Sequence, residues 1–555
     1  MKKKFNPLLI TSLIASCFIA SSCSFNDIIN ISTSNSTSQD STMNSLNSGN
    51  KDTTSGTTTN NSANQENINL SIVELNDMHG YAYESSYSSS YNLASFGYYV
   101  EKLQQKEEYD NVITIANGDM FQGTAFSNLS RGLSVINAMN EVGFDMMGIG
   151  NHEFDWGLDV VLKYFDGNLD NGEASFPLIN GNVKDSLNNN KLIGIDNEKD
   201  NIKPYTIVNK GGVNVGLLSY IGDQTSSICA NKFGSYYIDC YGSEDQNFIN
   251  EVRKQAIACK NDGADIIVLN IHEGNSSSVK NLYYNQAFAS MKDDDDNYLI
   301  DAVINGHTHT KQNGTITRPK GMALPIVQGG CNLNSVGTIS LEISGSTKKI
   351  VGLSCSSESL NSLVSSSSKK EAVQNVLTYE YSLIEDQIKM KYASASSSAS
   401  KSQIGLWCAN VMKQFSGADV SIINTGGIRA TLDAGDITIE TLYEVNPFDN
   451  SLIYVEVLGS ELISFYNAYP SYYYYNTDLD ISSINSSSTY KLLTIDYVYY
   501  GDYFQSKFKN AKLIKVNNEL CARDLMGRDL LSRSSGVWDP SSSSASIAPH
   551  EWPEI

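Results

Sequence analysis

Five of the six histidines in this 555-residue chain follow short, mainly apolar runs within four residues, and this placement constrains the fold more than any other feature. Runs of this length and composition are typical of buried strands. The runs are 70–75, 112–116, 146–149, 266–271 and 302–305. Helical patterns at 93–105 and 134–142 separate the first three runs. Strands that alternate with helices predict a layered α/β domain, in which the polar residues after the strands meet at one edge of a sheet.

Metal-binding side chains follow every one of these runs. They are Asp77 and His79, Asn117 and Asp119, Asn151 with His152 and Asp155, His272, and His307 with His309. Residues two apart on a strand point to the same face, so His307 and His309 can reach one ion. A lone histidine after a strand is more often structural than a ligand, but five beside carboxylates predict a metal centre. Such donors suit zinc, manganese, iron or cobalt, and two ions about 3.5–4 Å apart can share a carboxylate.

Charge and cysteine spacing limit the class of protein. The 39 Lys and Arg residues against 61 Asp and Glu residues give a formal net charge of -22, which disfavours a nucleic-acid polymer as partner. No cysteines form a Cys-x-x-Cys pair, so a zinc ribbon or a thioredoxin motif is excluded. Cys229 with Cys240 is the favoured local disulfide, and the alternative is that all the cysteines from 229 onward are buried thiols.

The start of the chain predicts export. Three lysines after Met1 precede the mostly apolar residues 8–20, as in a signal peptide. The signal is expected to end at residue 23 as a lipoprotein signal, and Cys23 is favoured over Cys17 as the acylated residue. An ordinary cleaved signal is the alternative. Residues 24–67, rich in Ser, Thr and Asn, predict a disordered tether. We therefore expect an exported protein at the cell surface, attached to the membrane by a lipid anchor only.

The remaining chain divides by composition into two domains. The first is expected at 68–350, and Ser-rich stretches then flank a helical pattern at 369–391, so that 351–395 forms a linker with an interdomain helix. The second domain is expected at 396–536, and 537–555 is expected to be a disordered tail.

Several motifs resemble one family. Gly118-Asp-Met-Phe-Gln-Gly-Thr124 and Gly150-Asn-His-Glu-Phe-Asp-Trp-Gly157 resemble the calcineurin-like metallophosphoesterases, and more narrowly the 5′-nucleotidase family of bacterial exported enzymes and animal ecto-enzymes. Asn424-Thr-Gly-Gly-Ile-Arg429 and Val445-Asn-Pro-Phe448 resemble that family's C-terminal nucleotide-binding domain. The resemblance covers roughly residues 70–510. It implies a layered α/β sandwich metallophosphoesterase domain followed by a smaller α+β domain.

The resemblance also implies roles for the clustered residues. It assigns Asp77, His79, Asp119 and His309 to a first metal and Asp119, Asn151, His272 and His307 to a second, with Asp119 bridging. His309 stands where many members have Gln. His152 matches the catalytic histidine and Asp155 its carboxylate partner. The two divalent ions would lower the pKa of a bridging water, which attacks phosphorus in line, while His152 stabilises the transition state or protonates the leaving oxygen.

The second domain supplies the expected substrate contacts. By the same resemblance, Asn424 and Arg429 are polar contacts and Phe448 is one of two rings that enclose the base. Tyr497 is the candidate for the second ring, with core packing as the alternative for both rings. Asp502 belongs to Tyr500-Gly-Asp-Tyr503, which replaces the family's usual Gly-Gly-Asp-Gly and is one residue shorter.

The function implied is hydrolysis of extracellular nucleotides to nucleoside and phosphate. Alternative substrates are a 2′,3′-cyclic nucleotide, a 3′-nucleotide or a nucleotide-sugar, because a metal centre grips only the phosphoryl group. An alternative of another class is a surface lipoprotein that binds nucleotides without catalysis. The presence of every ligand and of His152 favours the enzyme.

Overall fold

The computed structural model of the protein describes most of the chain from residue 66 onward. The described ranges are 66–83, 92–107, 111–194, 201–222, 228, 230–239, 245–273, 279–360 and 365–550. Contacts divide the chain into two units, one of residues 1–64 with 169–171 and one of 65–168 with 172–555. In the first unit only the short 3-10 helix Leu169–Asn171 is described. The fold below is that of the second unit. The expected export signal, the Cys17 and Cys23 alternatives, the tether up to residue 65 and the Cys229–Cys240 disulfide lie outside the described residues.

The first domain contains a seven-stranded sheet in the order β16-β15-β1-β2-β3-β4-β7. Its strands are β1 (Ile68–Leu75), β2 (Val112–Asn117), β3 (Met146–Gly148), β4 (Leu178–Ile179), β7 (Ile202–Lys203), β15 (Ser335–Ile343) and β16 (Ile350–Ser359). The central strands are parallel, and β15 and β16 are antiparallel additions at one edge. The carboxyl ends of β1, β2 and β3 therefore lie next to one another.

A second, six-stranded sheet of the same domain has the order β13-β14-β12-β11-β9-β8. Its strands are β8 (Tyr205–Lys210), β9 (Val213–Ile221), β11 (Ile266–His272), β12 (Ala302–Asn305), β13 (Lys311–Ile316) and β14 (Leu324–Gly329). Strands β9, β11, β12 and β14 are parallel. The small sheet β10-β5-β6 lies apart, with β5 (Val183–Asp185), β6 (Lys191–Leu192) and β10 (Tyr236–Ile238).

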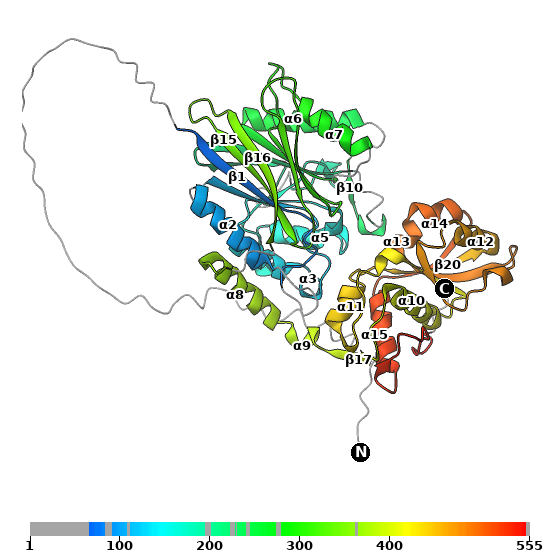
Figure 1. Ribbon diagram of the computed structural model, residues 1–555. Helices are drawn as coiled ribbons and strands as arrows, with labels where there is room; N and C mark the ends of the chain where they lie inside the picture. The colour runs from blue at the N-terminus through cyan, green and yellow to red at the C-terminus, as the bar shows by residue number, and fades with distance from the viewer. Residues whose placement is uncertain are drawn as a thin grey trace, which may run out of the picture. The chain divides into compact units, whose positions relative to one another are not determined.

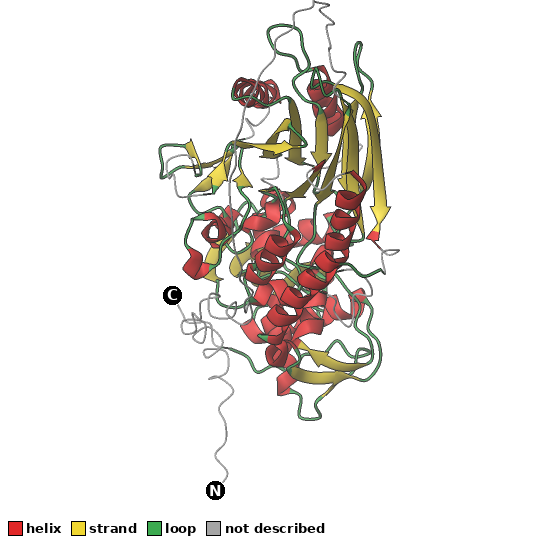
Figure 2. Cartoon of the chain, turned by 90° about the vertical axis from the view of Figure 1, so that its left-hand side faces the viewer, coloured by secondary structure: helices red, strands yellow, loops and turns green. Residues whose placement is uncertain are grey.

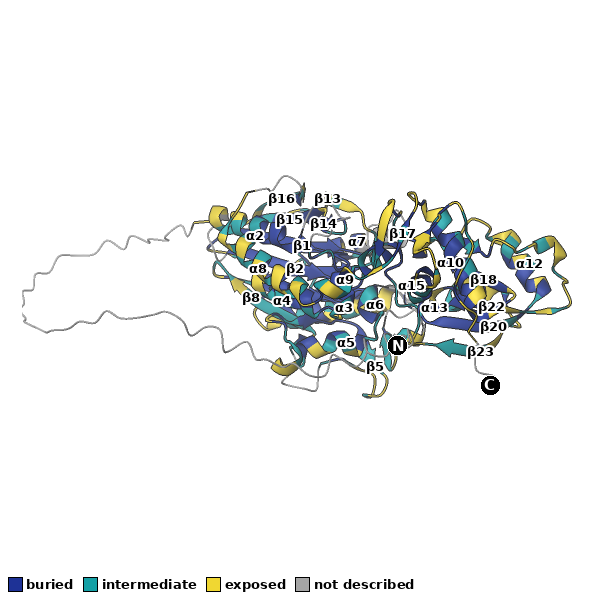
Figure 3. Cartoon of the chain, turned by 90° about the horizontal axis from the view of Figure 1, so that it is seen from below, coloured by how far each residue is buried: buried dark blue, intermediate teal, exposed yellow. Residues whose placement is uncertain are grey.

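The two large sheets share a core, and helices cover their outer faces. Fully buried Ile72 and Ile113 of the first sheet pack with Val215 and Ile304 of the second. Helices α2 (Leu93–Glu107), α4 (Leu133–Val142) and α8 (Ser368–Ser382) lie on one side, and α6 (Asp245–Asn261) and α7 (Val279–Ser290) on the other (Figures 1 and 2). In Figure 3 β1 and β2 are dark blue beneath the partly exposed helices α2, α4 and α8. The predicted layered α/β fold is confirmed.

The second domain is built on a five-stranded sheet in the order β21-β18-β22-β20-β23 and a small sheet β19-β17-β24. The strands are β17 (Lys391–Ala395), β18 (Val420–Asn424), β19 (Gly435–Thr438), β20 (Leu452–Leu458), β21 (Tyr473–Tyr475), β22 (Thr489–Ile495), β23 (Lys512–Asn517) and β24 (Val537–Trp538). The helices are α10 (Lys401–Ser416), α11 (Ile439–Val445), α12 (Gly459–Ala468), α13 (Asp496–Tyr500), α14 (Asp502–Lys507) and α15 (Ala522–Ser532). One core joins them, with the fully buried Trp407 and Trp538 rings 4.4 Å apart.

The domain boundaries differ from the sequence prediction at two places near the linker. Strand β16 extends the first sheet to Ser359, and β17 already pairs with β19 and β24 of the second domain. The predicted single helix 369–391 is α8 followed by the short α9 (Glu385–Ile388). Helix α8 belongs to the first domain, because Val373 and Leu377 are buried there and the Lys369 backbone N–H donates to Glu101 Oε2 at 2.8 Å.

The predicted tail also differs, since residues 537–550 pack on the second domain. Trp538 and Ile547 are buried in its core. The His550 backbone N–H donates to the Phe415 carbonyl at 2.7 Å, and the two rings stack 5.1 Å apart. The polar composition of this stretch conceals these few apolar anchors, which is why the sequence predicts disorder.

Candidate metal centre and substrate cavity

The loops after the strands hold five of the seven expected ligands in left-handed backbone conformations. The φ angles are 50° at Asp77, 51° at His79, 55° at Asp119, 77° at His307 and 55° at His309. Such angles are uncommon for residues other than glycine and cost about 1–3 kcal/mol each, so the surrounding structure has to impose them.

Hydrogen bonds between these loops impose the strained conformations. The Asp77 and His79 backbone N–H groups donate to the carbonyls of Gly118 at 3.1 Å and Asp119 at 2.9 Å. The His307 backbone N–H donates to Asp77 Oδ2 at 2.8 Å. The strand ends of both sheets are therefore tied into one cluster, as their position at the carboxyl edges predicts.

The side chains in this cluster point toward one another. Asp77 Oδ1 lies 3.4 Å from His309 Nε2, 3.9 Å from His272 Nε2 and 4.0 Å from His79 Nε2. His272 Nε2 lies 3.1 Å from Asp119 Oδ2, and His79 Nε2 lies 2.9 Å from His309 Nε2. Three overlapping sets have all donor atoms within 4.8 Å of one another: Asp77, His79 and His309; His79, Asp119 and His152; and Asp119, His272 and His307.

The donor set fits divalent metal ions. Asp77 Oδ1 is buried and accepts no hydrogen bond, a costly state that a bound cation would relieve. Asn151, the remaining expected ligand, places its Oδ1 atom 2.9 Å from His307 Nδ1. The structure thus brings all seven expected ligands together, with Asp119 in the set of His272 and His307 and also in a set with His79 and His152.

The charges in the cluster favour cations. Burial alone would lower the pKa of His272, but the Asp119 and Asp77 carboxylates outweigh burial and raise that pKa to about 10. Burial lowers the pKa of His79 to about 3 and that of His307 to about 4. Protons and metal ions therefore compete for the same carboxylate-lined space.

His152 and Asp155 form a separate pair beside the cluster. His152 Nδ1 lies 2.8 Å from Asp155 Oδ2, and the His152 backbone N–H donates to Asp119 Oδ1 at 2.8 Å. Burial would lower the pKa of His152, but Asp155 and Asp119 raise it to about 9. This is the geometry expected of an imidazole whose orientation is fixed by a carboxylate.

A cavity of about 330 Å³ joins this pair to the second domain. Its lining residues are Asp119, Asn151, His152, Asp155, His307, His309, Asn424, Gly426, Arg429, Phe448, Asn450 and Tyr497. The Arg429 guanidinium lies 5.0 Å from the centre of the Phe448 ring, and that ring lies 6.1 Å from the His152 ring. Four of the five expected substrate residues therefore meet the metal cluster in one space.

Asp502, the fifth expected substrate residue, lies elsewhere. It begins α14, its side chain is exposed, and it is absent from the linings of both described cavities. Helix α13 ends at Tyr500 and α14 begins at Asp502, and Tyr497 is the residue of this segment that lines the cavity.

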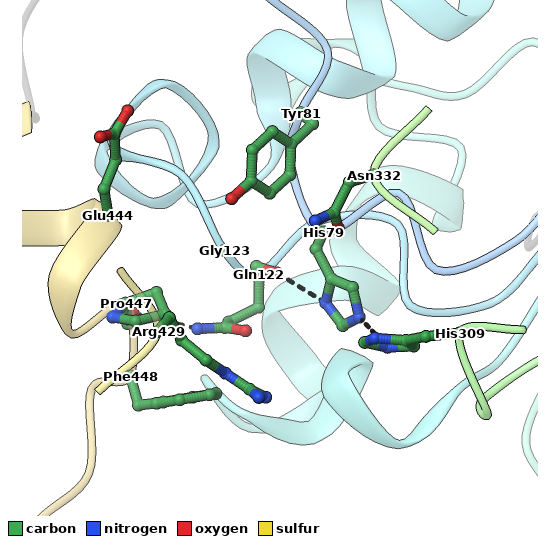
Figure 4. A pocket seen from close by; sticks show the side chains of 10 residues that line it. All are labelled: His79, Tyr81, Gln122, Gly123, His309, Asn332, Arg429, Glu444, Pro447 and Phe448. Atoms are coloured by element: carbon green, nitrogen blue, oxygen red, sulfur yellow. Dashed lines mark hydrogen bonds between the residues drawn. The ribbon is translucent and has the colours of Figure 1, made fainter. Parts of the chain in front are cut away.

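A smaller cavity of about 120 Å³ shares His309, Arg429 and Phe448 with the larger one (Figure 4). His79, Gln122, His309 and Asn332 line it from the first domain, and Arg429, Glu444, Pro447 and Phe448 from the second. Figure 4 shows the His79 ring pointing toward His309, with the Gln122 carbonyl behind it.

The loop that carries Phe448 is held from both domains. Gln122 Nε2 and Asn128 Nδ2 each donate to the Pro447 carbonyl at 3.0 Å. On the second-domain side, Arg523 Nη1 donates to the Asn446 carbonyl at 2.9 Å. The backbone before Phe448 is therefore held by side chains that lie outside the Val445–Phe448 motif.

Asp449 strengthens this attachment. It pairs with Arg131 of the first domain at 2.7 Å and with Arg523, whose guanidinium also lies 3.6 Å from the centre of the Tyr443 ring. Sequence reasoning did not find this arrangement, because its members are far apart in the chain.

Glu153 is a second residue that the sequence prediction missed. Its carboxylate accepts from the backbone N–H groups of Asp119 at 2.8 Å, Met120 at 2.9 Å and Gly150 at 2.7 Å. It thereby joins the loops after β2 and β3. The signal was its position inside the Gly150–Gly157 motif, next to His152.

Two family models match the chain. The model described as calcineurin-like phosphoesterase matches residues 70–311, and the model described as 5′-nucleotidase, C-terminal domain, matches residues 383–465. A 5′-nucleotidase of Vibrio parahaemolyticus is 23% identical over 442 residues, which are 72% of this chain and 74% of that protein. The endonuclease YhcR of Bacillus subtilis is 25% identical over 427 residues, 73% of this chain and 33% of that protein.

Among solved structures, a 5′-nucleotidase precursor from Thermus thermophilus has a similar fold, with a TM-score of 0.65 and 18% identity over 88% of this chain and 100% of that one. No helix within the described residues is long and apolar enough to cross a membrane.

Proposed function

We propose that this chain releases phosphate from 5′-nucleotides. The chain belongs to the 5′-nucleotidase family of calcineurin-like metallophosphoesterases and is a phosphoric ester hydrolase. The observation that carries the substrate class is the cavity of about 330 Å³, in which the metal-binding cluster and His152 face Arg429, Phe448 and Tyr497. A phosphoryl group at one end of this cavity leaves room for a ribose and a planar base at the other.

Two divalent ions of zinc, manganese, iron or cobalt would occupy the cluster. Asp77, His79, Asp119 and His309 would hold the first, and Asp119, Asn151, His272 and His307 the second. Bound there, the ions would act as Lewis acids on the phosphoryl oxygens and lower the pKa of water.

The His152–Asp155 pair acts on the leaving group. Asp155 occupies His152 Nδ1, so Nε2 is the nitrogen left to donate a proton toward the cavity that the ring lines. Donation to the leaving oxygen, or to the charge that develops on the phosphoryl group, accelerates hydrolysis.

The second domain recognises the nucleoside. Arg429 supplies a permanently charged donor for phosphate or ribose oxygens, and Asn424 supplies an amide at the end of β18. Phe448 and Tyr497 are the two rings available for stacking on the base. Tyr497 remains 44% exposed, so a bound base would cover it.

We further propose that the protein acts outside the cell on extracellular nucleotides. The basic and apolar start of the chain supports export, and Cys23, with Cys17 as the alternative, supports a lipid anchor. The net charge of -22 disfavours nucleic-acid polymers as substrates.

The experiment is phosphate release from a panel of substrates, with the purified protein loaded with Mn²⁺ or Zn²⁺. The panel holds 5′-monophosphates, 2′,3′-cyclic nucleotides, 3′-nucleotides and a nucleotide-sugar. We expect the highest kcat/KM on 5′-monophosphates, and turnover of cyclic nucleotides alone would overturn the substrate assignment.

Two measurements test the site itself. His152→Ala should lower kcat by about 10²–10⁴-fold, whereas Tyr379→Ala, an exposed tyrosine on α8, should not change it. Full activity of His152→Ala would refute the catalytic assignment. Metal analysis after reconstitution should give two ions per chain, and a metal-free protein would refute the ligand set.

A further inference from the structure

Asp496 joins the two chain segments that carry the proposed stacking rings. It directly precedes Tyr497, and its side chain is fully buried. Its Oδ1 accepts from the Tyr497 backbone N–H at 2.8 Å, and its Oδ2 accepts from the Ser451 backbone N–H at 3.1 Å. The Asp496 backbone N–H also donates to the Ser451 carbonyl at 2.9 Å. Because Ser451 is three residues after Phe448, this one carboxylate links the segments of both rings.

A short segment of the first domain completes these contacts. It is the 3-10 helix η7 (Ala230–Lys232). Asn231 Nδ2 donates to Asp496 Oδ2 at 3.2 Å, so this oxygen accepts from both domains. Lys232 Nζ donates at 3.3 Å to the carbonyl of Asp449, the residue directly after the first ring. Neighbouring side chains of η7 therefore reach one residue beside each ring.

The same segment is attached to the loop that carries the His152–Asp155 pair. Phe233, directly after η7, packs on Phe154, with the two ring centres 5.3 Å apart. Phe154 is fully buried and lies within the Gly150–Gly157 motif. A series of contacts thus runs from the His152 loop through η7 to the segments of both rings.

These contacting residues act from outside the substrate space. Asn231, Lys232 and Asp496 are absent from the linings of both described cavities. Any effect that they have on a substrate therefore passes through the rings whose segments they hold. The attraction between aromatic faces falls off steeply beyond van der Waals contact, so stacking on a base depends on the spacing of the two rings.

We propose that Asp496, held by Asn231 of the first domain, is the positioning residue for the base site, and that it favours nucleotides over base-free phosphate esters. This inference rests on the base contacts given under the proposed function. Through η7, recognition of the base depends on the domain that carries the proposed metal ligands. Loss of the Asn231 contact loosens the spacing of the rings and leaves the metal ligands and His152 in place.

The first test compares AMP with ribose 5-phosphate as substrates of metal-loaded wild type and variants. Ribose 5-phosphate has the same phosphoryl group and sugar but no base. Asn231→Ala should raise KM for AMP about 3–10-fold, the loss expected for one hydrogen bond, with kcat nearly unchanged. Its kcat/KM for ribose 5-phosphate should stay at the wild-type value.

The matched control is Asn209→Ala. Asn209 is another exposed asparagine of the first domain, and its Nδ2 donates at 2.7 Å to Asn214 in the same sheet. This variant should match wild type with both substrates, because its hydrogen bond does not involve the second domain.

The second test measures binding in place of turnover. Adenosine carries the base without a phosphate, so its Kd for the metal-free protein reports on the base site alone. Asn231→Ala and Asp496→Asn should each raise this Kd. The double variant should raise it by less than the product of the two single effects, because both residues act through one contact.

The outcomes separate this inference from the proposed function. An unchanged KM for AMP in Asn231→Ala, an equal loss with AMP and ribose 5-phosphate, or independent effects of the two variants on adenosine binding overturn the inference and leave the proposed function intact. A wild type that binds no adenosine, or that has equal kcat/KM for AMP and ribose 5-phosphate, overturns the inference together with the proposed base contacts. A wild type that hydrolyses no 5′-nucleotide overturns the proposed function as a whole.

Discussion

Replacing Arg523 with alanine should weaken the second domain and its hold on Phe448. Only 6% of the Arg523 side chain is exposed, and it pairs with Asp449, donates to the Asn446 carbonyl and stacks on Tyr443. Removing one member of a buried ion pair costs about 3–5 kcal/mol. Since Asp449 is 20% exposed and keeps Arg131, we expect the lower end, about 3 kcal/mol.

The assay is thermal unfolding together with steady-state kinetics. A domain of this size loses about 2–4 °C in Tm per kcal/mol, so Tm should fall by about 6–12 °C. The loop released from Arg523 carries Phe448, so KM for a 5′-nucleotide should also rise.

Arg131→Ala is the matched control, because Arg131 pairs with the same carboxylate but is 52% exposed. An exposed pair contributes about 0–1 kcal/mol, so its Tm should change little. If Arg523→Ala unfolds within about 2 °C of wild type, or if both variants lose the same stability, the reasoning from burial is refuted.

Three further predictions follow from the same site. Burial would raise the pKa of Asp449, but Arg523 and Arg131 outweigh burial and lower it. The ionised Asp449 carboxylate therefore stabilises the folded protein fully above the ordinary carboxyl pKa of about 4, and this stabilisation is lost as pH falls through the lower pKa of the folded state. Asp449→Asn should lose less Tm than wild type on acidification, and an identical loss would contradict this. Phe448→Ala should raise KM for 5′-nucleotides about fivefold through loss of roughly 1 kcal/mol of stacking. Phe448→Trp should keep KM for 5′-nucleotides near the wild-type value, and Phe448→Ala should leave KM for a base-free phosphate ester nearly unchanged. Removing metal with a chelator should lower Tm. Restoring Zn²⁺ at about 100 times its Kd should raise the free energy of unfolding by roughly 2.7 kcal/mol per site. An unchanged Tm after metal removal would contradict this prediction.

The sequence predicts the metal cluster well because each of its members follows a strand whose apolar pattern is plain. Asp77, Asp119 and His272 lie far apart in the chain, yet parallel strands in two packed sheets place their ends together. The strand spacing of two does not apply to His307 and His309, because both follow the end of β12 with left-handed φ angles and belong to different ligand sets.

Other features depended on contacts that no local pattern encodes. Helix α8 has the periodicity of any surface helix, and only its packing through Val373 and Leu377 assigns it to the first domain. The Arg523 contacts bring together chain segments more than 70 residues apart.

Strands β17 and β24 have a consequence for how this architecture can be altered. They pair in parallel, with Ser394 opposite Val537 and Ala395 opposite Trp538, so the first strand of the second domain lies beside its last strand. The connection to the first domain is then a single segment, 383–390, that contains α9. A unit that is joined to its neighbour by one segment can be exchanged between related proteins at one junction. Such an exchange would carry Arg429, Phe448 and Tyr497 with it, and would transfer the proposed base contacts without touching the proposed metal ligands.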